Sequence, residues 1–418
     1  MGMILTIAFR NIGRHKRRTI LSAITIAAGL VVFILMDSTL SGIDRMSIDN
    51  MITLTSGALK IQTVQYDKEK NTFPLTYGIN KSLSGLEAAL ARDKRVTHVT
   101  RRTQFLGQLS NYTESVPVVG TVVDEATDTT VFGLKPYITG SYFGADNARE
   151  ILIGKQLAQD LGVGVGDNIT LYALTKYDSR NADQFRIAGL LTTSDPIINH
   201  SGIFITFTAA NDFLDLESSV SEVDVAVRRN SNLAVFSREV KNIQAEVQPA
   251  FPLLRVNTFL ELGASVLEIT RAKRVSGIII MAIILVIAVV GIFNTVFMSV
   301  FERIREIGVL RAHGMKPRDI RIMFVLEGII TGLLGSVLGL ATGALVNWYL
   351  VTTGIPMEKA VGSIATASYG ISGSIYGEWD PAAMAISFCL GIFVATLAGI
   401  IPARKASKIQ VTQALRFN

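Results

Sequence analysis

The run GIIIMAIILVIAVVGIFNTVFMSV, residues 277–300, decides the fold of this chain. It contains no charged residue and has no polar face, which a helix on the surface of a soluble domain would need. A helix requires about 20 mostly apolar residues to cross the hydrocarbon core of a bilayer. We therefore predict that residues 277–300 span a membrane.

Three further runs have the same character, at residues 19–36, 328–350 and 381–403. The first of them follows a basic cluster, so a cleaved signal peptide is the alternative interpretation. We favour an uncleaved anchor, because the apolar run is long and is followed by Asp37 and Ser38 rather than by a small-x-small cleavage site. The sequence thus predicts a membrane protein with four transmembrane helices.

The distribution of Lys and Arg predicts the orientation, because cytoplasmic loops carry an excess of these residues. Residues 1–18 contain five Lys or Arg, the loop 301–327 contains six and the tail 404–418 contains four. The loop 351–380 has one lysine against three acids. We therefore expect both termini and the loop 301–327 to be cytoplasmic, and residues 37–276 and 351–380 to lie outside.

Residues 37–276 are long enough for a large folded domain. Strand-like stretches rich in β-branched residues are expected at 58–64, 118–123, 168–174, 185–191, 202–207 and 223–227. Helix-like stretches are expected at 83–91, 155–161, 207–214 and 233–248. This mixture predicts an extracytoplasmic α+β domain of one or two lobes. The chain has a single cysteine, Cys389, so no disulfide within the chain can stabilise the domain.

The sequence lacks the motifs of several kinds of binding and catalytic site. No G-x-x-x-x-G-K-[ST] motif occurs, so these residues cannot bind ATP through a P-loop. The four histidines are scattered without metal-ligand spacing, and no catalytic motif of a hydrolase is present. The predicted spans contain no charged residue, which argues against an ion or proton relay. We expect a non-catalytic protein without a metal or cofactor of its own, and no nucleic-acid partner, despite a net charge of +6.

Three segments stand out as candidate functional elements. The loop 301–327 begins with an amphipathic stretch that Gly314 can end, and Pro317 can begin the next helix; it is either a plain interfacial loop or a rigid element that docks a cytoplasmic partner. Glycines recur along one face of the third span, which is typical of close helix packing: Gly328, Gly332, Gly335, Gly339 and Gly343. Residues 1–18 form an amphipathic, basic lead-in, as in a helix on the inner membrane face.

Arg271, Lys273 and Arg274 precede the second span on the side that otherwise lacks basic residues. They are either interfacial anchors whose charged ends reach the headgroups or contacts for an anionic group at the outer leaflet.

Four stretches of this sequence resemble the FtsX-like permeases of ABC transporters, in the branch that includes the MacB type and the lipoprotein-releasing LolC and LolE type. Residues 8–18, AFRNIGRHKRR, are similar to the cytoplasmic lead-in of that family. Residues 302–314, ERIREIGVLRAHG, resemble its coupling segment, which is the most specific match. Residues 151–167 resemble part of a MacB-like periplasmic core domain, and PARKA at 402–406 with ALR at 414–416 resembles the family's C-terminal end.

The resemblance implies a mechanotransmission device in the cell inner membrane. Two such chains, identical or different, would each work with an ABC ATPase of the LolD or MacB type, which binds the ATP. The residues that would carry ATPase coupling are Glu302, Arg303, Glu306, Gly308, Leu310, Arg311 and Gly314.

Lipoprotein release is the function that the resemblance favours, with Arg271, Lys273 and Arg274 as a hypothetical contact for the lipoprotein or amphiphilic cargo. A periplasmic chaperone is a further candidate partner, although residues 173–184, where LolC has a proline-rich hook, contain no proline. The alternatives are MacB-like efflux of peptides or small amphiphiles, FtsX-like regulation of a cell-wall hydrolase, and a receptor without an ATPase. The coupling segment argues against the receptor.

Overall fold

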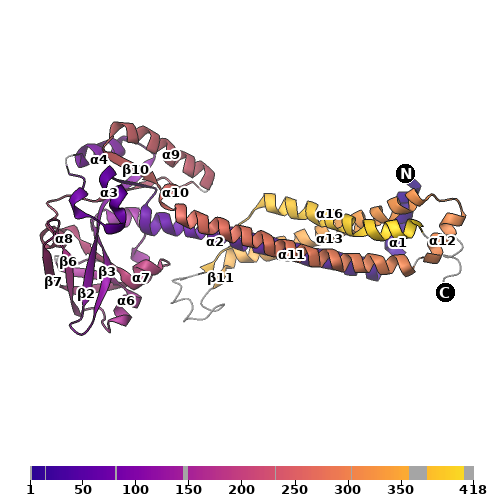
Figure 1. The fold of residues 1–418 in the computed structure, drawn as a ribbon, viewed down its shortest axis with the longest axis horizontal. Coiled ribbons are helices and arrows are strands. Elements are labelled where there is room, and N and C mark those ends of the chain that lie inside the picture. Colours follow the sequence, from indigo (N-terminus) through magenta and orange to yellow (C-terminus); the bar gives the residue numbers. More distant parts are fainter. Residues whose placement is uncertain are drawn as a thin grey trace. The chain divides into compact units, whose positions relative to one another are not determined.

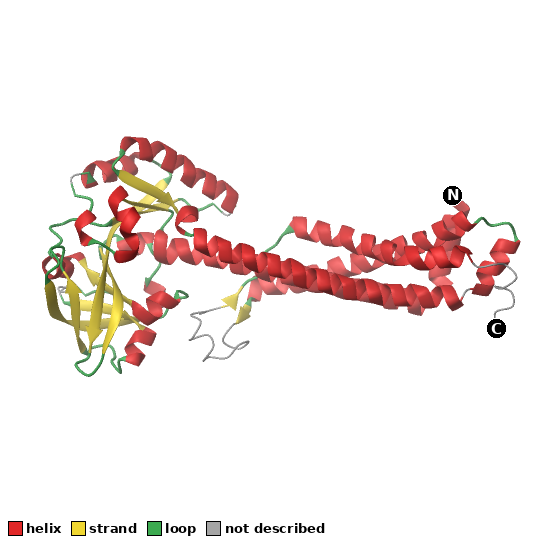
Figure 2. Cartoon of the chain, in the orientation of Figure 1, coloured by secondary structure: helices red, strands yellow, loops and turns green. Residues whose placement is uncertain are grey.

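A computed structural model describes residues 2–14, 16–80, 82–144, 149–230, 232–302, 304–356 and 374–408. The chain divides into two compact units. The first, which we call the helical unit, comprises residues 1–44, 269–355 and 375–418. The second, the outer domain, comprises residues 45–268 and 356–374. Figure 1 follows the chain through both units, and Figure 2 distinguishes their helices from their strands.

Long helices make up the helical unit. They are α1 (Gly2–Arg14), α2 (Lys16–Asn50), α11 (Ala264–Glu302), α12 (Ile304–Ala312), α13 (Pro317–Thr353) and α16 (Pro381–Lys408), of which α2 and α11 continue into the outer domain. Among the described residues, three stretches are long and apolar enough to cross a membrane: Thr19–Ser56, Pro317–Thr353 and Pro381–Lys405. The predicted span 277–300 lies inside α11, where Ile278, Ile283 and Val290 are exposed.

The helices extend beyond the predicted spans. Helix α2 continues through Asp37, which we expected to lie beyond the first span, and ends at Asn50. Helix α13 begins at Pro317, well before the predicted start of its span at residue 328. Hydropathy identifies only the part of a helix that lies in the hydrocarbon core. The backbone hydrogen bonds that define the helix also form between polar residues, so the helix extends beyond that part. The apolar runs therefore do not predict where these helices begin and end.

Helix α13 is central to the packing of the helical unit. It lies beside α16 over much of its length, and it also contacts α1 (Figure 1). A buried cluster joins α2 to α16 through Ile26, Leu30, Val394, Ala395 and Ala398.

One mixed sheet runs through the outer domain, with the strand order β10-β1-β9-β2-β3-β8-β5-β7-β4 and with β6 paired to both β2 and β7. Its strands are β1 (Leu59–Thr63), β2 (Val96–Ser110), β3 (Ser115–Val123), β4 (Ile138–Gly140), β5 (Glu150–Gly154), β6 (Asn168–Leu174), β7 (Arg180–Leu191), β8 (Gly202–Thr206), β9 (Glu222–Val227) and β10 (Leu254–Thr258). Two short strands, β11 (Ile355–Pro356) and β12 (Ser374–Ile375), form a separate pair.

Short helices pack on the sheet. They are η1 (Met51–Ser56), α3 (Val64–Glu69), η2 (Lys70–Thr72), η3 (Leu75–Tyr77), α4 (Leu83–Arg92), α5 (Asp128–Val131), η4 (Lys135–Tyr137), α6 (Lys155–Asp160), α7 (Pro196–Ser201), α8 (Phe207–Leu214), α9 (Leu233–Ala250) and α10 (Phe259–Leu262). The two largest buried clusters lie over different strands. One, around Phe105 and Phe185, covers β2, β3 and β5 to β8, and the other, around Leu59 and Phe259, covers β1, β9 and β10. Helices with an α+β domain confirm the predicted fold class.

The local predictions hold best where the apolar pattern is strong. Strand β6 and helix α8 have the predicted bounds. Strand β2 was missed, because the stretch Thr100–Gln104 is polar and includes Arg101 and Arg102. Arg102 is nevertheless 2% exposed, and its charge is balanced inside the domain.

Candidate functional site

Helix α12 is the core of the candidate coupling segment. It ends in a Schellman motif, in which the amide of Met315 donates to the carbonyl of Leu310 at 3.2 Å and the amide of Gly314 donates to that of Arg311 at 3.0 Å. Gly314 has a φ of 88°, which side-chain-bearing residues rarely adopt. Helix α13 then begins at Pro317. The helix–turn–helix expected from Gly314 and Pro317 is present.

One face of α12 is fixed to the helices around it. Ile304 and Ile307 are 5% and 1% exposed, and Gly308 is buried between them and the next turn. Ile307 belongs to a buried cluster with Ile320, Met323 and Phe324 of α13 and Ala403 of α16; partly buried side chains pack against it from α1, from α12 and from the turn after α12 (Ile7, Leu310 and Met315). Three long helices thus meet α12 in one apolar core.

Polar contacts support the same arrangement. The Nη1 atom of Arg311 donates to the carbonyl of Ser407 at 3.5 Å, which joins α12 to the end of α16. The Nδ2 atom of Asn11 donates to Oε1 of Glu327 at 2.9 Å, which joins α1 to α13.

The opposite face of α12 is open. Arg305 and Glu306 are exposed, and Val309 is 43% exposed. Of the predicted coupling residues, Glu306 and Gly314 are exposed, Leu310 and Arg311 are half-buried, and Gly308 is buried. Arg303 and the side chain of Glu302 lie outside the described residues. Sequence reasoning missed Arg305 and Val309, although their spacing of four residues places them on one helix face.

The glycines of α13 lie in two close helix contacts. A Cβ added at Gly328 would lie 3.1 Å from the carbonyl oxygen of Ala395 on α16. One added at Gly339 would lie 3.0 Å from the Cα of Ala27 on α2. Gly332 also faces α16, whereas Gly335 and Gly343 face α2. The stripe therefore changes partner along α13, and the three helices approach one another backbone to backbone.

The basic group before the predicted second span lies on α11. Arg271, Lys273 and Arg274 are helical, and their side chains lie outside the described part of the chain.

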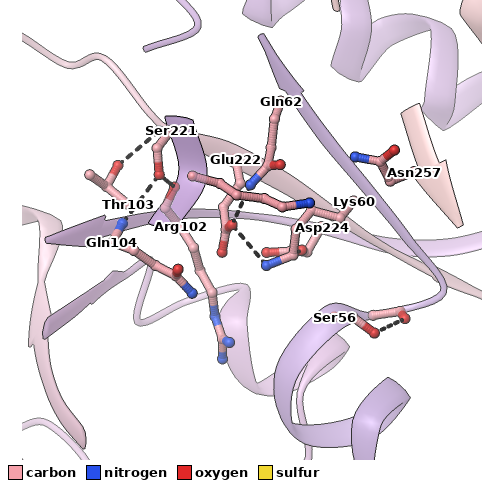
Figure 3. Close-up of polar contacts among 12 residues, drawn as sticks. Ser56, Lys60, Gln62, Arg102, Thr103, Gln104, Ser221, Glu222, Asp224 and Asn257 are labelled. Carbon is pink, nitrogen blue, oxygen red and sulfur yellow. Dashed lines mark hydrogen bonds and ion pairs between the residues drawn. The ribbon is translucent and has the colours of Figure 1, made fainter. Parts of the chain in front are cut away.

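A buried charged network crosses the sheet of the outer domain (Figure 3). The Nζ atom of Lys60 lies 2.8 Å from Oε2 of Glu222 and 3.6 Å from Oδ1 of Asp224, and all three side chains are buried. On β2, Arg102 forms a bidentate pair with Asp128 at 2.7 and 3.1 Å. Burial raises the pKa of Asp224 to about 8, and the positive charge of Lys60 acts in the opposite direction without cancelling this effect.

This network contains no nucleophile paired with a base. The described residues also contain no group of three His, Cys, Asp or Glu side chains that could hold a metal ion. The residues present suit a structural role, since buried charges in a domain interior are normally paired.

Two known protein families match this chain, each over a different part of it. A profile of the FtsX-like permease C-terminal family matches residues 278–411. A profile of the MacB-like periplasmic core domain matches residues 19–243, more than half of the 418 residues. The chain belongs to the FtsX- and MacB-like ABC transporter permeases. It is thus a membrane protein with an extracytoplasmic domain of the periplasmic type, and its family agrees with the expected non-catalytic subunit.

Individual relatives differ in how much they share with this permease. The ABC transporter permease YtrF of Bacillus subtilis is 31% identical over 58% of this chain and 56% of its own length. The lipoprotein-releasing system transmembrane protein LolC of Neisseria meningitidis is 23% identical over 64% of this chain and 65% of its own. The macrolide export ATP-binding/permease protein MacB of Bdellovibrio bacteriovorus is 23% identical over 98% of this chain and 61% of its own.

The chain therefore spans about three fifths of the length of these relatives. The LolC type, which the sequence motifs favour, is more distant than YtrF in sequence identity.

Proposed function

We propose that this permease relays the motion of an ABC ATPase, bound on the cytoplasmic side through α12, to the outer domain. The observation that carries the proposal is the two-sided character of α12. Its buried face packs against α13, while Arg305, Glu306 and Val309 remain exposed on the other side. A helix of this kind offers charged and apolar contacts to a partner without giving up its own packing.

The packing of α12 also explains how a push would be transmitted. Because interiors are close-packed, a displaced Ile307 forces its neighbours on α13 to move with it. Ala403 of α16 and Ile7 of α1 contact the same cluster. The ATPase would be of the LolD or MacB type, and these 418 residues contain no P-loop motif of their own. A second permease chain would complete the transporter.

We infer that the cargo is a lipoprotein, which the transporter releases from the inner membrane. The similarity to LolC over 64% of this chain supports this cargo. The basic group Arg271, Lys273 and Arg274 would contact the cargo at the outer leaflet. Residues 173–184, at the turn between β6 and β7, are the proposed place for a periplasmic chaperone.

Efflux of peptides or small amphiphiles is the second candidate. The observation that favours it is the match to MacB, which covers 98% of this chain and thus both units.

The coupling proposal can be tested by co-expression of the permease with its cognate ATPase. In Glu306→Lys, the reversed charge on the exposed face should abolish co-purification of the ATPase. Glu69→Lys is a matched control, since Glu69 is an exposed glutamate of the outer domain. Undiminished ATPase recovery with both Glu306→Lys and Val309→Asp would refute the docking role of this face.

The cargo proposal is tested on the same purified complex by mass spectrometry. Triacylated lipoproteins should co-purify without ATP and dissociate on its addition. The triple variant Arg271→Ala, Lys273→Ala, Arg274→Ala should retain the ATPase but lose the lipoproteins. A stable ATPase complex that never carries lipoprotein would favour efflux or regulation of an outer partner instead.

A further inference from the structure

The outer domain contains a cleft of about 480 Å³ beside its buried charged network. η1, α5, α9 and the adjacent ends of β2 and β9 line it. A volume of this order is typical of sites for small organic molecules, which lie in the range of roughly 300–1,000 Å³.

The base of the cleft is apolar. Ile52, Phe132 and Phe236 line it and are 7%, 0% and 3% exposed. Phe132 is held in place from within the domain, because the Cζ atom of Arg102 lies 3.3 Å from the centre of its ring. Val131 and Ala226 also line the cleft and are half-buried, so they supply the apolar surface that a short apolar group can contact, with the three buried side chains packed behind them.

Threonine hydroxyls add hydrogen-bonding capacity above this base. Thr53, Thr97, Thr129 and Thr130 all line the cleft. The hydroxyls of Thr97 and Thr130 already donate to the backbone carbonyls of Ala226 and Thr127, at 3.1 and 2.6 Å. Thr97 lies at an irregularity in the pairing of β2 with β9, between Val96 and His98. The hydroxyl of Thr129 has no hydrogen-bond partner among the described residues, so it can donate to a ligand.

The charged side chains that line the cleft are all positive. Arg228 and Arg229 line it, and no carboxylate does. Arg229 is already held by Asp49 at 3.1 Å and by the hydroxyl of Thr53 at 3.3 Å. The backbone amide of Arg228 donates to the carbonyl of Arg95 at 2.9 Å, but its exposed guanidinium pairs with no described residue. One positive charge thus lies at the cleft without a counter-ion among the residues that the structure describes.

We propose that this cleft binds a small amphiphile with a phosphate or carboxylate group, with Arg228 as the residue that binds the anion. The apolar base receives the hydrocarbon part, and Thr129 donates a hydrogen bond to an oxygen of the ligand. A guanidinium is suited to this role because its N–H donors match the geometry of both anions. The site requires neither the ATPase nor any particular cargo, so it stands apart from the function proposed above.

Binding can be measured directly by isothermal titration calorimetry on the full-length chain in a non-ionic detergent, which carries no anionic group of its own. Three water-soluble probes separate the two parts of the site: hexyl phosphate, inorganic phosphate and hexanol. Titration of each probe into detergent alone corrects for partition into micelles. We expect hexyl phosphate to bind at least about tenfold more tightly than either of the others, the effect of about 1.4 kcal/mol of added contact.

Variants then locate the site. Arg228→Gln should weaken binding of hexyl phosphate by about tenfold or more, because a charge-assisted hydrogen bond is lost. Thr129→Val, which removes a hydroxyl at nearly constant volume, should weaken binding more modestly. Arg186→Gln is the matched control, since Arg186 is an exposed arginine on β7 that does not line the cleft. Thermal unfolding verifies that each variant is folded.

Two results would overturn the proposal. Equal affinity of Arg228→Gln and the unchanged chain for hexyl phosphate would exclude Arg228 as the anion-binding residue. Equal affinity for hexyl phosphate and hexanol, or for hexyl phosphate and inorganic phosphate, would show that the site does not recognise an amphiphilic anion.

Discussion

Lys60 and Asp224 lie directly opposite each other on β1 and β9, with the Nζ atom 3.6 Å from Oδ1. Glu222 lies one pair further along the same face and accepts a hydrogen bond from Lys60 at 2.8 Å. A single buried lysine therefore lies between two buried acidic side chains. The oxygens of Asp224 receive no hydrogen bond from a described side chain, which makes this residue the least satisfied member of the network.

Replacement of Lys60 by Met should strongly destabilise the outer domain. The variant leaves the buried carboxylate of Glu222 without its cation, and such a loss costs about 3–5 kcal/mol. Hydrogen exchange of the amides of β1 and β9 in the full chain should report it as faster opening. Lys68→Met, at an exposed position on α3, should leave the exchange unchanged. Equal protection in both variants would contradict a stabilising role for the Lys60 ion pair.

Asp224 should make the stability of the outer domain depend on pH. Burial raises its folded-state pKa to about 8, whereas the unfolded value is about 3.9. The folded domain thus holds a proton that the unfolded chain releases, so the contribution of Asp224 to stability is fully present below about pH 4 and is lost as the pH rises to about 8. The charged groups that face Asp224 are Lys60, Glu222, Arg102 and Asp128.

The test is denaturant unfolding of the full chain between pH 5 and pH 8. The contribution of Asp224 has a slope of at most about 1.4 kcal/mol per pH unit. Asp224→Asn, which is neutral at every pH, should lose this slope, while Asp212→Asn at an exposed position should retain it. An unchanged slope in Asp224→Asn would show that another group holds the proton.

Gly339→Leu should destabilise the helical unit. The first added carbon would lie 3.0 Å from the Cα of Ala27 and from the Cβ of Leu30, so α13 and α2 must separate. Overpacking of this kind costs about 1–3 kcal/mol. The melting temperature in detergent should fall for Gly339→Leu and stay unchanged for Ala341→Leu, which is exposed on the same helix. Similar melting temperatures for the two variants would exclude close packing at Gly339.

Gly314→Ala should weaken the end of α12. Its φ of 88° strains any residue with a Cβ, and such a substitution costs about 1 kcal/mol or more. We expect faster hydrogen exchange in the last turn of α12 and a weaker complex with the ATPase. Gly13→Ala in helix α1 is the control, because an added Cβ there meets no atom within 4 Å. A Gly314→Ala variant as well protected as Gly13→Ala would rule out a structural requirement for this glycine.

Much of the local structure follows from sequence alone. The runs at 19–36, 328–350 and 381–403 lie in helices that can cross a membrane, because an uncharged run of that length has no other stable environment. Gly314 and Pro317 determine the turn between α12 and α13 for an equally local reason. Gly314 can adopt a positive φ, and Pro317 has no amide hydrogen with which to continue a preceding helix. The resemblance to the permease family was also visible in local motifs.

The tertiary structure decides which polar side chains are buried. It also decides which distant residues line the same cleft. Arg102 and Asp224 look like surface residues in the sequence, yet their partners on other strands hold them in the interior. Arg228 and Thr129 are far apart in the chain, and only the sheet topology places both at one cleft. Hydropathy and spacing depend on neighbours along the chain, whereas the energy of a buried charge depends on residues brought close by the fold.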